Sequence, residues 1–197
     1  MAFITRSYAK TFPDAWQRLL LLALAFTLGS SAVQAEGFSI QAATVYGQEG
    51  RYRLNASIQY DLSDEVLKAL NNGVPLTLVL ETRVQRVRPW WSNALLARQE
   101  QRHQLTFHAF SGQYLVRNLA SDTLEIYPSL ASALFELGTV VNLPLLPVSE
   151  LTAGKDYEVQ LRTLLDIETL PAPLRPVAYV NPGWRLISEW FTCPLRP

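Results

Sequence analysis

The side chains that most often act in catalysis are few in this chain, and their spacing brings few of them together. Asp166 and Glu168 lie two residues apart in a segment with strand-like alternation, which would put both carboxylates on one face, as general acid–base catalysis requires. Glu158, Gln160 and Arg162 continue the same polar row, however, and such a row is typical of the solvated outer face of a sheet. We therefore assign no catalytic residue.

The sequence predicts neither a metal site nor a bound cofactor. His103 and His108 are five residues apart in a predicted strand, so their side chains point to opposite faces and cannot share a metal ion. The chain also lacks a nucleophile motif of the G-x-S-x-G type and a glycine-rich phosphate loop. Cys193, the only cysteine, cannot form a disulfide within the chain, and a buried, inert thiol is favoured over one that cross-links two chains.

Residues 81–103 are the one segment in which basic side chains clearly outnumber acidic ones. Five arginines are set against Glu81 and Glu100, and two tryptophans lie between two predicted strands. If these strands pair, the arginines and the indoles gather at one edge of a sheet. The residues, which we call the Arg/Trp surface, are Arg83, Arg86, Arg88, Trp90, Trp91, Arg98 and Arg102.

The Arg/Trp surface has two interpretations. Guanidinium groups beside exposed indoles could bind an anionic partner, such as a lipid head group, a polysaccharide or an acidic protein surface. Alternatively, the charges only keep an edge strand from aggregating, while the tryptophans pack on the core. In the second interpretation, replacing both tryptophans would lower folding stability without the loss of any partner.

The elements that would position these residues are mostly β-strands. Residues 51–62 alternate apolar and polar side chains, which is typical of a strand with one face on a core and the other in water. Ser111 and Gly112 lie between two alternating segments and predict a hairpin turn. The predicted strands cover residues 38–46, 51–62, 76–84, 103–109, 114–117, 124–127, 140–146, 157–167 and 183–191.

Two short helices interrupt the predicted strands. Ser63 precedes two acidic residues and an apolar stripe that Gly73 ends, so this segment has an N-cap, acids at the positive end of the helix dipole and a C-terminal glycine. Pro128 opens a second helix, which ends at Gly138. The closely spaced prolines of residues 170–176 predict extended chain instead.

This pattern predicts an all-β fold, an antiparallel β-sandwich that is immunoglobulin-like in architecture and carries two short helices. A helix-covered half-barrel is the alternative. Residues 36–197 have the length of a single domain, and we expect one β-sandwich domain there. The chain has 17 basic and 17 acidic residues, so its composition gives no sign of a nucleic-acid partner.

The N-terminus has the pattern of a secretory signal peptide. A basic segment ending at Arg18 is followed by the apolar residues 19–28 and then by small residues up to Ala35. The apolar run is about half the ~20 residues that a membrane-spanning helix needs. We therefore predict a signal peptide at residues 1–35, cleavage after Ala35 and a periplasmic protein without a transmembrane segment; an uncleaved anchor in the inner membrane is the alternative.

Four segments together carry a resemblance to a known family. They are residues 63–76, the turn Arg88-Pro89-Trp90-Trp91, residues 162–174 and residues 184–190. In these segments the chain resembles the exported Gram-negative family of domain of unknown function 4390, whose members are often labelled "proline rich signal peptide protein". The resemblance covers essentially all of the mature chain. It implies export but no activity, cofactor or catalytic residue.

These observations favour a non-enzymatic protein-interaction module of the cell envelope that binds through the Arg/Trp surface. The resemblance implies one partner, the periplasmic domain of a two-component sensor kinase, because members of the family are commonly encoded near such a kinase. The sequence also leaves open a contact between the folded domain and a membrane surface. The alternative function is a carrier of a lipid or another apolar ligand between the sheets, in a pocket lined by residues such as Tyr52, Leu78 and Val159.

Overall fold

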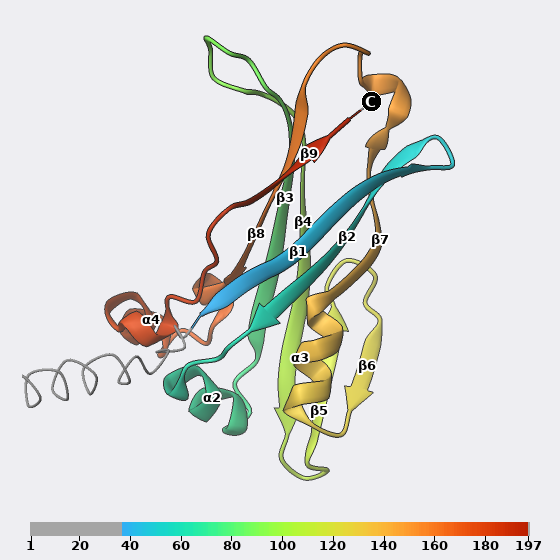
Figure 1. Ribbon diagram of the computed structural model, residues 1–197. Helices are drawn as coiled ribbons and strands as arrows, with labels where there is room; N and C mark the ends of the chain where they lie inside the picture. The colour runs from blue at the N-terminus through green and yellow to red at the C-terminus, as the bar shows by residue number, and fades with distance from the viewer. Residues whose placement is uncertain (1–36, 197) are drawn as a thin grey trace, which may run out of the picture. The chain divides into compact units, whose positions relative to one another are not determined.

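The computed structural model describes residues 37–196 (Figure 1). The predicted signal peptide, with its cleavage after Ala35, lies outside the described residues. None of the helices in residues 37–196 has the length and apolar character needed to cross a membrane.

The smaller of two antiparallel sheets has three strands in the order β1-β2-β7. They are β1 (Phe38–Gln48), β2 (Arg51–Tyr60) and β7 (Thr139–Pro147). Glu49 and Gly50 join β1 to β2 with φ angles of 51° and 73°, and two left-handed residues give the turn the twist that a tight hairpin requires. The turn lies between the two strands predicted for residues 38–46 and 51–62.

The larger sheet has six strands in the order β6-β5-β4-β3-β8-β9. Hairpins join β3 to β4, β4 to β5 and β5 to β6, and Gly112, with a φ of 67°, permits the predicted turn between β4 and β5. Strand β8 pairs with β3 and with β9, in both cases across a long stretch of chain. The strands are β3 (Leu76–Arg86), β4 (Ala94–His108), β5 (Gln113–Asn118), β6 (Leu124–Tyr127), β8 (Tyr157–Leu165) and β9 (Phe191–Leu195).

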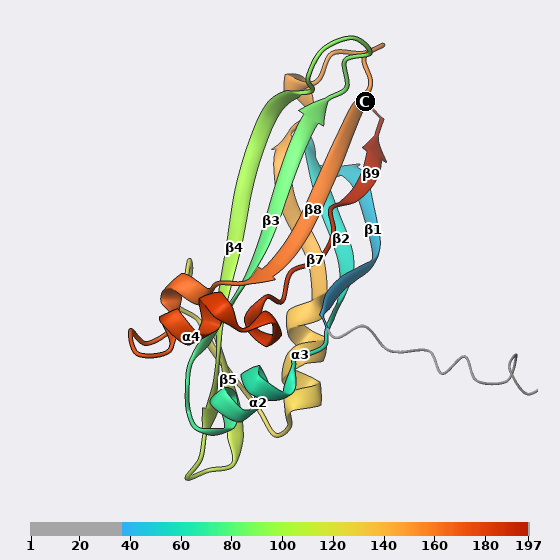
Figure 2. The same ribbon diagram turned by 90° about the vertical axis from the view of Figure 1, so that its left-hand side faces the viewer.

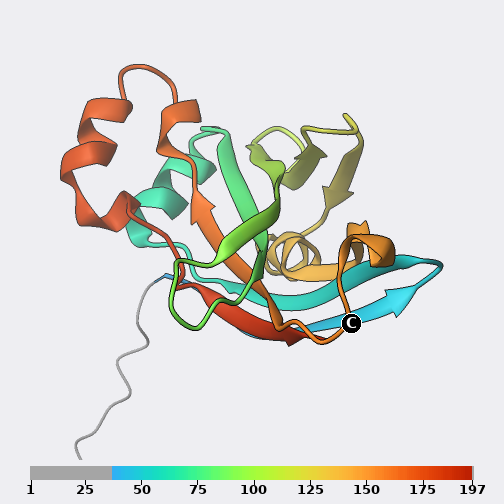
Figure 3. The ribbon, with the colours of Figure 1, turned by 90° about the horizontal axis from the view of Figure 1, so that it is seen from above.

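The two sheets face each other and enclose the core, as Figures 2 and 3 show from two directions. Strand β2 turns its alternate apolar residues inward, and Leu54 is fully buried against the buried rows of β3 and β8. Thr163 of β8 donates a hydrogen bond of 3.2 Å to the hydroxyl of Tyr60, which ties the small sheet to the large one. Burial raises the pKa of Tyr60 to about 12, so this hydroxyl is neutral at physiological pH. The predicted all-β sandwich is confirmed.

Helices close the ends that the strands leave open. Helix α2 (Asp64–Asn71) begins as predicted, with the Ser63 hydroxyl accepting a hydrogen bond from the amide of Val66. Helix α3 (Leu130–Gly138) begins with a capping box in which Ser129 and Ser132 exchange hydrogen bonds, and it packs against β2 and β5. Gly138 ends α3 where the helix meets the backbone of Ile58, too close for any larger residue.

Four local predictions are wrong. Strand β4 begins at Ala94, nine residues before the predicted start at residue 103, because its pairing with β3 continues to Arg86. Residues 170–176 are not wholly extended, because helix α4 (Arg175–Val180) begins inside them with Pro176 in its first turn, where a missing amide hydrogen costs nothing. The last strand starts at Phe191, after the short 3-10 helix η3 (Pro182–Trp184) and an irregular stretch. Strand β8 ends at Leu165, and the 3-10 helix η2 (Ile167–Thr169) follows it.

Replacing Gly138 by alanine should lower the free energy of unfolding by about 1–3 kcal/mol, as overpacking does elsewhere. The new Cβ would clash with the carbonyl oxygen of Ile58 and lie 3.2 Å from its carbonyl carbon, and strand backbone has no room to retreat. Urea unfolding measures the change. Gly47→Ala is the matched control, since its Cβ would meet only Tyr52 at 3.9 Å; an equal loss in both variants would contradict the close approach.

Candidate functional site

The structure divides the Arg/Trp surface into two groups with different surroundings. One group lies in the connection between β3 and β4, at one end of the sandwich (Figure 1). We call residues 86–96 the hairpin tip; it contains Arg86, Arg88, Trp90 and Trp91. The other group, Arg83, Arg98 and Arg102, lies on the outer face of the large sheet, where Arg83 and Arg98 pair across β3 and β4.

Hydrogen bonds at its base hold the hairpin tip in place. Strand β3 ends at Arg86, and the amide of Val87 donates to the carbonyl of Asp156, 2.9 Å away. The side chain of Asn93 accepts from the amide of Arg88 and donates to the carboxylate of Glu158 at 2.9 Å. Asn93 thus links the loop to the neighbouring strand β8. These hydrogen bonds fix the position of the hairpin tip relative to the large sheet.

The two tryptophans of the hairpin tip point into solvent. Trp90 is 90% exposed and Trp91 is 79% exposed, although an indole can bury about 150–250 Å² of surface when it packs. Val87, Leu95 and Leu96 beside them are also exposed. The alternative in which the tryptophans pack on the core is therefore wrong, because the loop carries them beyond the end of the sandwich.

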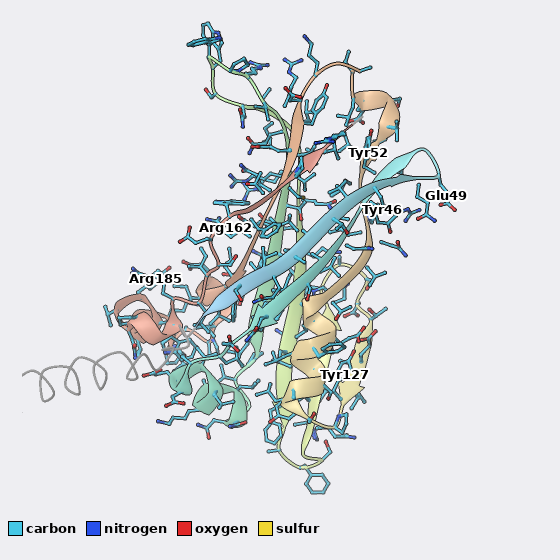
Figure 4. The ribbon with its side chains drawn as sticks, in the orientation of Figure 1. Tyr46, Glu49, Tyr52, Tyr127, Arg162 and Arg185 are labelled. Carbon is cyan, nitrogen blue, oxygen red and sulfur yellow. The ribbon has the colours of Figure 1, made fainter. Side chains whose placement is uncertain are left out.

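Two arginines of the second group, Arg83 and Arg98, instead lie around a buried carboxylate. Glu81 lies on the outer face of β3, yet only 8% of its side chain is exposed. It pairs with Arg162 at 2.6 Å and with Arg98 at 3.0 Å, while Arg83 lies 4.0 Å away. Figure 4 labels Arg162, which reaches Glu81 from the neighbouring strand β8. Glu81 is thus the centre of an ion-pair cluster that joins three strands.

The cluster continues along β4 and is covered by an indole. Arg102 contacts Glu100 at 3.5 Å and Asp166 at 3.0 Å. Trp190 lies 4.2 Å from the guanidinium of Arg83 and 4.5 Å from that of Arg162, both distances to the ring centre, so it stacks on the two cations. The acids hold Arg83, Arg98 and Arg102 in a structural network of the sheet.

Sequence reasoning missed this cluster, although its signal was present. The predicted register of residues 76–84 places Glu81 and Arg83 on one face, and Arg162 occupies the same face of its own strand. The missing information was that β3 lies between β4 and β8, whose arginines, together with Trp190, bury the outer face of β3 at Glu81. Trp190 could not be placed because its segment was predicted as a strand.

The carboxylates considered for catalysis do not form a pair. Asp166 follows the end of β8, where its side chain accepts a hydrogen bond from the amide of Glu168 and pairs with Arg102. The carboxylate of Glu168 contacts the hydroxyl of Tyr179 instead. The expectation that both acids share one face of a strand is therefore wrong, because the chain turns into η2 between them.

A pocket of about 220 Å³ opens between the sheets, where β7 and α3 face β4. Leu78, Leu80 and Leu143 are among its apolar residues, and Gln101 and His103 of β4 are among the polar ones. Burial lowers the pKa of His103, and the charge of Glu125 opposes this in part. The residues Tyr52 and Val159, expected to line such a pocket, belong to the closed core instead.

The remaining reactive side chains lie apart. Cys193 is buried in β9, as predicted, and its thiol lies 3.6 Å from the carbonyl oxygen of Val159. Burial raises the pKa of this thiol, which keeps it protonated and unreactive. Within residues 37–196, no three histidine, cysteine, aspartate or glutamate side chains are placed to hold a metal ion.

The comparison with protein families identifies the chain. The model of a domain of unknown function, DUF4390, matches residues 35–194 and so includes the hairpin tip, the ion-pair cluster and both sheets. The chain belongs to this family. A search of curated proteins and a search of solved structures give no match. For this DUF4390 protein, the geometry of the hairpin tip and of the pocket is therefore the basis for a functional proposal.

Glu81→Gln should lower the free energy of unfolding by about 2–3 kcal/mol, less than the loss of a fully buried ion pair because the arginines are partly exposed. The amide keeps the shape of the side chain but leaves clustered guanidinium groups without their shared anion. Urea unfolding measures the effect. Glu100→Gln, at the more exposed edge of the cluster, should cost less than about 1 kcal/mol; equal losses would show that Glu81 is not the centre.

Stability should fall as the pH is lowered through about 6.5, the ordinary pKa of histidine, and the fall should stop below the lowered pKa of His103. Between these two pH values His103 is protonated in the unfolded chain but neutral in the folded chain, so lowering the pH favours unfolding. Thermal melting between pH 7.5 and 5.5 measures the loss. His103→Gln should reduce it, whereas His108→Gln should not, because His108 is exposed at the end of β4.

Proposed function

We propose that this protein is exported to the periplasm and acts there as a non-enzymatic interaction module of the cell envelope. In this proposal the hairpin tip is the element that makes contact. The signal-peptide pattern before residue 36 supports the compartment, and the family match extends over the whole region that follows it.

The observation that carries the proposal is the exposure of Trp90 and Trp91 on a loop that hydrogen bonds hold in place. Folding leaves both indoles in water, and Asn93 keeps the loop from collapsing onto the sheet. Large exposed aromatic side chains beside arginines are the residues that dominate binding energy at interfaces. Their fixed position lowers the entropy cost of binding.

A second candidate function rests on the pocket between the sheets. Its volume of about 220 Å³ is smaller than the ~300–1,000 Å³ typical of drug-sized ligand sites, and His103 and Gln101 make part of its wall polar. Such a pocket suits a small ligand better than a lipid chain. The core beside it is filled, with Leu54, Val159 and Leu161 fully buried, and a filled core favours the interaction module over a carrier.

Site-specific photo-crosslinking in living cells tests the interaction module. A photoreactive phenylalanine analogue in place of Trp91 should give an adduct with an envelope component. The expected protein partner is an envelope protein such as the periplasmic domain of a sensor kinase, and deletion of the kinase gene should then remove the adduct. Mass analysis of the recovered protein also reports whether the chain begins at Glu36.

The control position for crosslinking is Phe110, which is 98% exposed in the turn between β4 and β5, at the opposite end of β4 from the hairpin tip. The analogue at this position should give no specific adduct. Equal adducts at both positions, or none with protein or lipid at Trp91, would argue against the hairpin tip as the contact element.

A further inference from the structure

The hairpin tip combines exposed apolar side chains with uncompensated positive charge. Between Thr82 and Gln99 the sequence contains four arginines and no acidic residue. Arg83 and Arg98 belong to the ion-pair cluster, but within residues 37–196 no ion pair involves Arg86 or Arg88. These two cations therefore remain available to an anionic partner beside the tryptophans.

The acids near the base of the hairpin tip do not cancel this charge. Glu158 accepts hydrogen bonds from the side-chain amides of Asn93 and Gln160, so its carboxylate is already engaged at the base of the hairpin tip. The surface depression beside Val87 contains Asp156, Glu158 and one cation, Arg196. The hairpin tip itself has two arginines and no acidic residue, and this charge suits a negatively charged surface.

The shape of the hairpin tip also restricts the partner. The most exposed side chains, Trp90 and Trp91, lie in the turn of a two-stranded loop, so they form a narrow convex end rather than a flat area. A standard protein interface buries about 800 Å² on each partner and seats its strongest residues in well-packed pockets near its centre. A bilayer surface, in contrast, admits a narrow wedge without a complementary pocket.

We propose that the hairpin tip docks on a phospholipid bilayer that contains anionic lipids. Trp90 and Trp91 enter the interfacial layer, where indole rings are most stable because their apolar body and polar N–H are both satisfied. Leu95 and Val87 follow them, and Arg86 and Arg88 lie at the level of the lipid phosphates. This inference rests on the proposed function and names the envelope component that the hairpin tip contacts.

Sedimentation with lipid vesicles tests the inference on the protein recovered after export. Vesicles of phosphatidylglycerol mixed with phosphatidylethanolamine should bind it and should shift its tryptophan emission to the blue. Vesicles of phosphatidylcholine alone should bind it at least about tenfold more weakly, since each arginine near an anionic surface adds attraction. Added salt should reduce the difference between the two vesicle types.

The matched variants differ only at the substituted side chains and share one N-terminus. A difference in vesicle binding between them therefore comes from the substituted residues. Trp90→Ala/Trp91→Ala should lose about tenfold or more in binding and the blue shift, since Trp184 is buried and Trp190 is stacked on Arg83 and Arg162. Arg86→Gln/Arg88→Gln should lose the preference for anionic vesicles. Phe110→Ala, which removes an exposed aromatic side chain elsewhere, should bind like the parent protein. Melting temperatures close to that of the parent protein would confirm that all variants fold.

Three outcomes would overturn the inference. They are no sedimentation of the parent protein with anionic vesicles, equal binding by Trp90→Ala/Trp91→Ala, and equal loss in Phe110→Ala. A protein adduct at Trp91 in cells without vesicle binding would also overturn it but would leave the interaction module intact. If neither adducts nor vesicle binding were found, both proposals would fail.

Discussion

The structure depends on one constraint, that β3 is buried on both faces. Its inner residues pack against the small sheet, while its outer residues lie between the side chains of β4 and β8, and Trp190 stacks on the arginines there. A carboxylate at Glu81 is tolerable in this position only because arginines from three strands share it. The cluster therefore fixes the alignment of β3 with both neighbours, and the hairpin tip is the direct continuation of two strands aligned in this way.

Much of the fold could be predicted because its signals are local. The alternation in β2, the Ser63 cap and the turn at Gly112 each depend on a few adjacent residues. The sheet order is not local, and so the pairing of β3 with β8 and the burial of Glu81 remained hidden. The last strand and α4 were wrong for a related reason, since tertiary contacts rather than periodicity decide where short terminal elements form.

The same holds for the candidate site: residue content could be read from the sequence, but the positions of the side chains in the fold could not. Arginine and tryptophan content pointed to a segment whose two indoles are exposed, and this exposure agrees with the binding interpretation. Composition alone could not tell which arginines are neutralised. Arg98 and Arg102 lie on the outer face of the sheet beside acids, whereas Arg88 lies past the end of β3, where the strand pairing that brings acids close has stopped.

The length of β4 has a mechanical consequence. A strand of 15 residues spans about 50 Å, and β4 runs without a break from the hairpin tip to the turn that carries Phe110. Strands β3 and β5 pair with it on either side in one continuous six-stranded sheet, which resists bending. The strand therefore acts as a rigid spacer. When a partner binds one end of β4, the distance and the orientation of the other end relative to that partner are fixed. The pocket at His103 lies about two-thirds of the way along β4 from the hairpin tip. A surface bound to the hairpin tip would therefore leave this pocket uncovered.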